Sequence, residues 1–248
     1  NASDEDYVSW NWKAGGAVSA DNNTDGDIDS TVSANTTAGF SIVTWVPNGS
    51  STDRIGHGLG VAPNFLTYRP LGSAIDWYIW TDAVGYGEWV LQNDTGAGAA
   101  WNSGTYGSNA NATGFSNYGW ALSPYVKMLA YCFASVENYS KVGAYTGNGN
   151  ADGAFVYTGF RPAWLLAKWT ASGESWYVWD VKRNPHNAAS ISLWTNGNWA
   201  EASSAGYAVD LVSNGFKLRA STPAINSSSN AIIYMAFAES PFKYSNAR

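Results

Sequence analysis

The feature that most limits how this sequence can fold is a short apolar stretch that occurs three times, at residues 7–12, 128–134 and 232–238. Each copy is rich in aromatic and aliphatic residues, carries no charge and is bounded by polar segments. Such runs are typical of a strand buried on both faces. Two copies are followed by an acid and a lysine, Glu137 with Lys141 and Glu239 with Lys243. We interpret the stretch as the closing strand of a repeated domain.

Other motifs recur in the same order at a period of about 100 residues. Residues 58–66 match 158–166, residues 76–82 match 175–180, and residues 113–116 match 214–217. This pattern predicts two tandem repeats, 39–141 and 142–248. Residues 1–13 are interpreted as the closing strand of an upstream repeat or domain, and 14–38 as a linker or loop with a brief strand possible near 31–33. We therefore expect the chain to be part of a longer protein.

The predicted fold class is all-β. Apolar residues nowhere recur at helical spacing over three turns, so we expect almost no helix. Many short strands follow one another at about ten-residue spacing, separated by Gly and Asn turns. The pattern indicates two tandem repeated β-sandwiches of the jelly-roll or a related Greek-key type.

The composition is rich in aromatic residues and poor in charge. Aromatic residues make up 15% of the chain and charged residues 13%, where about 25% charged is ordinary. The solvent-exposed surface must therefore consist largely of Asn, Ser, Thr and Gly. Such a surface suits an extracellular or virion-surface protein. The net charge of −6 argues against nucleic-acid and anionic-membrane partners. No apolar segment approaches 18 residues, so no membrane insertion is predicted.

Cys132 is the one cysteine of the sequence and lies within a closing strand. A disulfide within the chain is therefore impossible, and a buried, small apolar residue is the expected role. Stability must come from core packing and, we expect, from oligomerisation.

The acidic segment Asp21–Asp29 has oxygen-bearing side chains at alternate positions, as in a calcium-binding loop. Asp21, Asn23, Asp25 and Asp29 fit the first, third, fifth and ninth positions, but Val32 stands where a bidentate Glu closes the shell. Clusters of Asp, Asn and Gly are also ordinary turn formers. We assign no metal ligand and no cofactor, and leave calcium at this loop open.

No catalytic residues are assigned, and the chain is predicted not to be an enzyme. His57 and His186 occupy different places in their repeats, no Gly-x-Ser-x-Gly motif accompanies them, and both are expected in loops. A glycoside hydrolase needs two carboxylates that face a cleft. Five acids near Trp-rich strands leave this alternative open: Asp76, Asp82, Glu88, Glu174 and Asp180.

Aromatic side chains are the candidates for carbohydrate contact, since their faces stack on sugar C–H surfaces. The Trp and Tyr residues at 77–80 and 176–179 alternate between the two faces of their strands, so at most half of them are available. Aromatic residues in polar loops are the better candidates for ligand binding: Trp101, Tyr106, Tyr118, Trp120, Trp194 and Trp199. For each of these, burial in a core or subunit interface is the alternative.

Several motifs together resemble one recurrent type of bacteriophage protein. They are the segments 10–16, 39–45, 56–63, 145–153, 158–164 and 213–219 and the C-terminal segment 235–248. The chain is similar to the C-terminal region of tail-fibre-like or other virion-surface proteins of tailed phages, a region often found after concanavalin-like lectin domains. The resemblance implies a place on the virion surface and brings no catalytic residues with it.

The function expected from the sequence is a non-catalytic module of a phage virion that recognises a host-surface glycan or another receptor. Expected partners are other virion proteins, further copies of the chain in a homotrimer, and a host glycan. One alternative is a structural fibre or decoration protein without receptor binding. The other is a polysaccharide depolymerase, which should show an acid pair in a groove.

Overall fold

The computed structural model describes residues 6–50, 52–72, 74–84, 88–96, 99–100, 110–116, 126–171 and 173–241. Antiparallel strands make up nearly all of its regular structure, which confirms the predicted all-β, sandwich-like class. The described helical elements are the single turn α1 (Pro223–Asn226) and the 3₁₀ turns η1 (Asp82–Val84) and η2 (Ala205–Tyr207). Among the described residues, no helix is long and apolar enough to cross a membrane.

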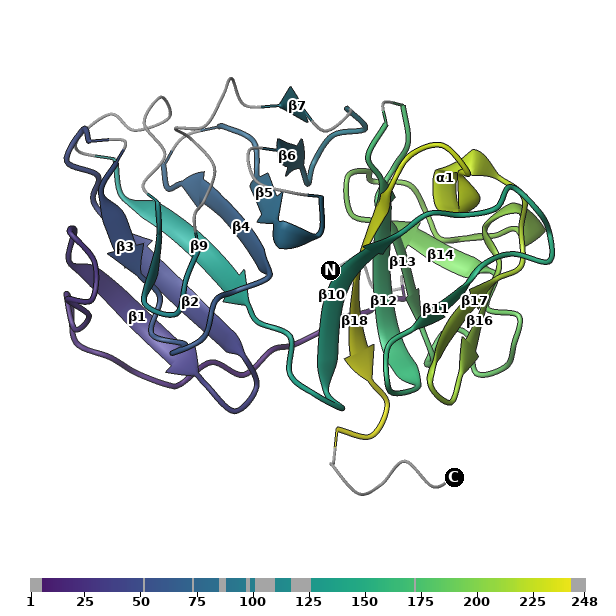
Figure 1. Ribbon diagram of the computed structural model, residues 1–248, viewed down its shortest axis with the longest axis horizontal. Coiled ribbons are helices and arrows are strands. Elements are labelled where there is room, and N and C mark those ends of the chain that lie inside the picture. Colours follow the sequence, from purple (N-terminus) through teal and green to yellow (C-terminus); the bar gives the residue numbers. More distant parts are fainter. Residues whose placement is uncertain are drawn as a thin grey trace.

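The first half of the chain contains one large and one small sheet (Figure 1). The large sheet runs in the order β1 (Ser30–Asn35), β2 (Phe40–Trp45), β9 (Met128–Phe133), β4 (Phe65–Pro70), β5 (Tyr78–Thr81), β6 (Glu88–Leu91) and β7 (Ala99–Ala100). The small sheet pairs β3 (Arg54–Gly56) with β8 (Gly114–Ser116).

The second half has the same plan. Its large sheet runs in the order β10 (Ser140–Tyr145), β18 (Ile232–Ala238), β12 (Pro162–Trp169), β13 (Tyr177–Asp180), β14 (Ile191–Trp194) and β15 (Ala202–Ser203). Its small sheet runs in the order β11 (Phe155–Tyr157), β17 (Gly215–Leu218) and β16 (Val209–Val212). The order β10-β18-β12-β13-β14-β15 matches β2-β9-β4-β5-β6-β7, with the apolar stretches at 128–134 and 232–238 forming β9 and β18 in equivalent, central places.

Side-chain alternation along the strands produces three separate cores. On β18, Ile232, Tyr234 and Ala236 pack against the small sheet of their own half. Residues between them on the same strand, Ile233 and Met235, face the opposite way and join a second core. Since successive residues of a strand point to opposite faces, each large sheet is buried on both sides.

The core between the two large sheets is shared by both halves of the chain. The first half contributes Phe40, Phe65, Ile79, Val90 and Phe133, and the second half contributes Trp164, Leu166, Trp176, Val178, Ile233, Met235 and Phe237. The molecule therefore has four layers: a small sheet, two large sheets face to face, and another small sheet. The two halves are joined by an apolar interface as well as by the chain.

The segments before the first repeat pack differently from the sequence-based expectation. Residues 1–13 were predicted to form a closing strand. Residues 6–13, the described part of that segment, form no strand, and neither does Ala14. The brief strand expected near 31–33 is present as the edge strand β1, and Asn22, from the part expected as linker or loop, covers the outer edge of that strand. The Asn22 side chain accepts a hydrogen bond from Val32 N at 2.8 Å and donates one to Val32 O at 3.1 Å. These bonds satisfy edge groups that would otherwise invite pairing with another chain.

Candidate functional site

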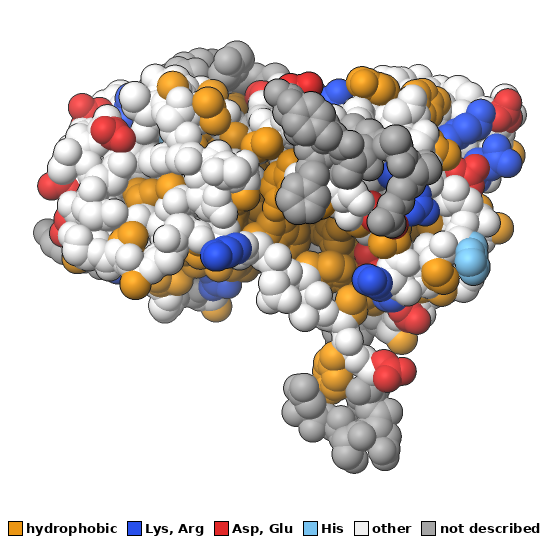
Figure 2. Space-filling model, turned by 90° about the horizontal axis from the view of Figure 1, so that it is seen from below, with side chains coloured by type: hydrophobic (Ala, Val, Ile, Leu, Met, Phe, Trp, Pro, Cys, Tyr) orange, Lys and Arg blue, Asp and Glu red, His pale blue; other side chains and the backbone are white. Residues whose placement is uncertain are grey.

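A groove of about 550 Å³ lies between the two large sheets. Figure 2 shows hydrophobic side chains gathered in a hollow between the two halves of the molecule. The described residues that line the groove are apolar, aromatic, amide or hydroxyl residues: Trp10, Asn11, Trp12, Phe40, Ile42, Phe65, Thr67, Trp77, Gln92, Tyr131, Phe133, Trp164, Leu166, Thr195 and Met235. None of these side chains carries a charge at neutral pH. The size and the mostly apolar lining with a few polar groups are those of a small-molecule pocket.

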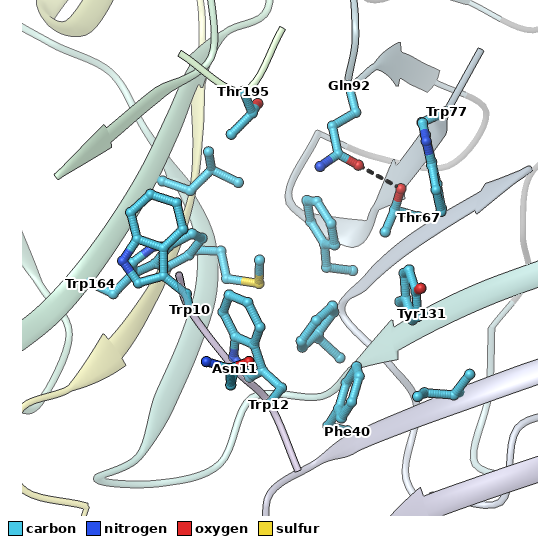
Figure 3. A pocket seen from close by; sticks show the side chains of 15 residues that line it. Trp10, Asn11, Trp12, Phe40, Thr67, Trp77, Gln92, Tyr131, Trp164 and Thr195 are labelled. Carbon is cyan, nitrogen blue, oxygen red and sulfur yellow. Dashed lines mark hydrogen bonds between the residues drawn. The ribbon is translucent and has the colours of Figure 1, made fainter. Parts of the chain in front are cut away.

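One wall of the groove is a row of rings on the first large sheet (Figure 3). Trp77 stacks on Tyr131 with 5.7 Å between ring centroids and 14° between planes. Tyr131 in turn stacks on Phe40 at 6.3 Å. The guanidinium of Arg69 lies 5.3 Å from the centre of the Trp77 ring. Because each ring is held by a neighbour, this wall is fixed before any ligand arrives.

The opposite wall combines the second large sheet with the N-terminal segment. Trp12 makes edge-to-face contacts with Trp164 at 5.4 Å and with Phe237 at 5.4 Å, and it also touches Phe133 of the first half at 6.0 Å. Trp10 lies against Trp164 at 6.2 Å. Trp12 thus bridges the two halves, and the segment expected to be a strand closes one side of the groove instead.

The polar groups of the groove include a fixed amide. The hydroxyl of Thr67 donates a hydrogen bond of 2.8 Å to Gln92 Oε1, and Gln92 N donates one of 2.9 Å to Trp77 O. The Gln92 Nε2 group has no hydrogen-bond partner among the described residues, and it lies at the groove (Figure 3). It can therefore donate to a ligand without breaking a bond within the protein.

Polar contacts across the two halves fix the separation of the walls. The indole N–H of Trp176 donates to Leu91 O at 2.7 Å. Lys168 is fully buried, and its ammonium donates to the carbonyl oxygens of Glu174 at 2.7 Å, Trp169 at 3.0 Å and Thr95 at 3.4 Å. Burial lowers the pKa of Lys168 to about 8, so these bonds are made mostly by the charged form at neutral pH. The groove is accordingly a rigid feature of the fold.

A family model for a domain of unknown function, DUF7483, matches residues 1–241. The chain belongs to the DUF7483 family. A search of curated proteins and a search of solved structures each returned no match. The family description names no activity, ligand or source, so the resemblance to phage tail-fibre-like proteins remains a prediction.

Of the six predicted loop aromatics of this DUF7483 chain, the two within the described residues, Trp194 and Trp199, do not line the groove. The other four, Trp101, Tyr106, Tyr118 and Trp120, lie outside the described residues. Trp194 is the last residue of strand β14 and not a loop residue as predicted, and it is partly buried against the core of the second half. Trp199 is 57% exposed and meets Trp194 edge to face at 5.9 Å. Sequence reasoning considered Trp77 only among the less favoured strand aromatics at 77–80 and missed the other groove residues, which come from segments far apart in the chain.

Five acids of this DUF7483 chain were the candidates for a glycoside hydrolase. The four whose side chains are described accept hydrogen bonds or form an ion pair within the fold. Asp180 is buried, accepts from the backbone N–H groups of Lys182 and Arg183, and pairs with the Arg183 guanidinium at 2.6 Å. Asp76 accepts from Asn93, and Asp82 accepts from Asn64. Glu174 accepts from the Tyr177 hydroxyl at 3.3 Å, and the side chain of Glu88 lies outside the described set. None of the four described side chains lines the groove.

His57 and Cys132 are buried side chains of the first half. His57 lies in the loop after β3, as predicted, and it is fully buried, with Nε2 2.9 Å from Asn111 O and Nδ1 accepting from Leu59 N at 3.1 Å. These bonds fix the neutral tautomer with the proton on Nε2. Burial also lowers the pKa of His57. Cys132 is buried, as expected, and burial raises the pKa of its thiol to about 12.

Side-chain oxygens of the acidic loop at 21–29 accept hydrogen bonds from backbone N–H groups of the protein. Asn23 Oδ1 accepts from Asp25 N, and Asp27 Oδ2 accepts from Arg54 N. Among the described residues there is no group of three or more His, Cys, Asp or Glu side chains that could hold a metal ion. The loop therefore gives the calcium hypothesis no support.

Proposed function

We propose that this protein is a non-catalytic recognition module of a phage virion surface, and that it binds a host-surface glycan in the groove between its two large sheets. The observation that carries the proposal is the groove itself. It is lined by aromatic rings from both halves, together with amide and hydroxyl groups, and hydrogen bonds between the two halves connect the sheets that form its walls. Aromatic rings offer apolar surface to sugar C–H groups, while amides and hydroxyls bond to sugar hydroxyls.

Two further observations support a binding role over catalysis. The described lining contains no carboxylate, imidazole, thiol or amine that could transfer a proton or attack a substrate. The acids nearest the Trp-rich strands already accept hydrogen bonds from turns or a neighbouring arginine. A depolymerase would need a pair of free carboxylates across a cleft.

The place on a virion rests on the resemblance of the sequence motifs. A polar, weakly charged surface with net charge −6 agrees with it. A homotrimer, as expected for such fibres, would place copies of the groove around one axis and raise the apparent affinity for a repetitive polysaccharide.

Binding to an array of bacterial surface polysaccharides and to intact bacterial cells tests this proposal. We expect saturable binding to at least one polysaccharide, lost when that polysaccharide is stripped from the cells. Trp77→Ala and Trp10→Ala should weaken binding at least tenfold, because each removes part of one wall. Trp199→Ala is the matched control, since this tryptophan is exposed and lies outside the described lining.

Three results would overturn the proposal in different ways. A folded, correctly assembled protein that binds neither polysaccharides nor cells would favour a structural virion protein. Loss of binding in Trp199→Ala with full binding in Trp77→Ala would move the site to the loop aromatics. Release of sugar fragments during the binding assay would favour a depolymerase.

A structural role has one observation in its favour. The short strand β11 exposes Phe155 and Tyr157, with 48% and 60% of their surfaces accessible. Both side chains point away from the core that buries Val156 between them. Two exposed aromatic residues on one edge strand suit a contact with another protein, and such a contact is compatible with ligand binding in the groove.

A further inference from the structure

The lining of the groove restricts the chemistry of its ligand. No described lining residue is charged. The nearby guanidinium groups lie over the rings of the walls: Arg69 is 5.3 Å from the centre of the Trp77 ring, and Arg183 is 5.7 Å from that of Trp10. Arg183 is also paired with Asp180. An anionic sugar would bring its carboxylate between aromatic walls with no cation among the described lining residues, and the desolvation of that charge would oppose binding.

The lining also favours a ligand with more apolar surface than an ordinary hexose. Eleven of the fifteen lining residues are aromatic or aliphatic; the others are Asn11, Thr67, Gln92 and Thr195. A hexose is surrounded by hydroxyl groups, so several of them would lose water in this groove without gaining a partner. Replacing one hydroxyl by an acetamido group supplies a methyl group for the aromatic walls, and an amide N–H and carbonyl take the place of the hydroxyl as polar groups.

Gln92 supplies the specific partner for such a group. Its Oε1 atom is engaged by the Thr67 hydroxyl at 2.8 Å, which fixes the orientation of the amide. The Nε2 group is thereby presented as a donor, with no partner among the described residues. A carbonyl oxygen is the complementary acceptor. The acetamido group combines that carbonyl with a methyl group in one planar unit.

Resting on the proposed glycan function, we propose that the groove selects a neutral 2-acetamido sugar. Its acetamido carbonyl accepts a hydrogen bond from Gln92 Nε2, and its methyl group packs against the aromatic walls. Thr67 is a positioning residue, because it acts through Gln92. Sugars that carry a carboxylate, and hexoses with only hydroxyl groups, bind more weakly in the same groove.

Calorimetric titration with two neutral disaccharides tests the proposal. Chitobiose and cellobiose have the same β-1,4-linked backbone and differ at the 2-position, where one carries acetamido and the other hydroxyl groups. The wild-type protein should bind chitobiose at least tenfold more tightly than cellobiose, a preference worth about 1.4 kcal/mol.

The diagnostic variant is Gln92→Glu. It keeps the size of the side chain and the acceptor for Thr67, but replaces the N–H donor by an oxygen. The preference for chitobiose should fall to near unity in this variant. Thr67→Val should reduce the preference partly, because the amide loses its fixed orientation. Trp199→Ala is the control, since this exposed side chain lies outside the described lining, and it should keep the preference.

The possible failures separate this inference from the proposed function. Equal binding of both disaccharides, or an unchanged preference in Gln92→Glu, overturns the acetamido selection and leaves glycan binding in place. If the protein binds bacterial polysaccharides that contain no acetamido sugar but binds neither disaccharide, the acetamido selection is likewise overturned and glycan binding stays in place. Absence of binding to every polysaccharide, to cells and to both disaccharides overturns both.

Discussion

At the scale of single residues, His57 links the stability of the protein to pH. Its pKa is lowered in the folded protein, chiefly by burial, whereas in the unfolded chain it has the ordinary value of about 6.5. As the pH falls below that value, the unfolded chain takes up a proton that the folded protein does not. The free energy of unfolding should therefore be at its full value above pH 6.5 and decrease below it.

Urea unfolding at pH 7.5 and pH 5.5 measures this effect. The decrease between the two pH values should be smaller in His57→Gln, which has no imidazole to protonate. His186→Gln is the matched control: His186 is exposed, and this variant should keep the decrease of the wild type. An equal decrease in all three proteins would show that other groups cause it.

Two tryptophans of the core shared by both halves provide a second residue-scale prediction. Trp176 donates to Leu91 O across the two halves, whereas the indole N–H of Trp164 has no hydrogen-bond partner among the described residues. Both are buried, so replacement by Phe removes similar volume. Trp176→Phe should lower the free energy of unfolding by about 1 kcal/mol more than Trp164→Phe, the net value of one hydrogen bond. Chemical unfolding of both variants gives the difference, and equal losses would mean that the bond contributes nothing.

At the scale of elements, the N-terminal segment shows where sequence reasoning succeeds and where it fails. The stretches at 128–134 and 232–238 form central strands buried on both faces, as their unbroken apolar character predicts. Residues 7–12 have a similar pattern, yet they form no strand. Pattern alone cannot separate the two cases, because alternate aromatic residues suit a strand face and also a segment that inserts two side chains between sheets.

The groove could not be predicted for a related reason. Trp77 and Trp176 hold equivalent places in the two halves, just before β5 and β13, but one lines the groove and the other is buried at the interface. The difference arises from how the two sheets meet, which no local pattern encodes. The sequence did hold one signal: residues 176–179 are apolar on both faces, and so require a second surface to pack against.

The N-terminal segment should contribute to stability as an element of the interface. Trp12 contacts rings from both halves and is partly buried. Trp12→Ala should lower the free energy of unfolding by about 2–3 kcal/mol, somewhat less than a fully buried Trp→Ala substitution costs. Trp199→Ala, at an exposed position, should change it by less than about 1 kcal/mol. Equal effects of the two substitutions in denaturant titrations would show that the segment is not bound between the sheets.

At the scale of the whole molecule, the shared core decides how the two halves unfold. Tandem repeats joined only by a linker unfold independently, but here the large sheets bury rings and aliphatic side chains against each other. Separation of the halves would expose buried side chains such as Trp164, Trp176, Val178, Ile233 and Phe237. Full burial of one large apolar side chain stabilises a protein by about 1.5–3 kcal/mol. A state with only one half folded would lose this contribution and leave Trp176 and Lys168 without their partners across the interface. We therefore expect one calorimetric transition with a van't Hoff enthalpy close to the calorimetric enthalpy. Two resolved transitions in the wild-type protein would mean that the halves are stable alone, and the groove between them would then be a hinge instead of a rigid site.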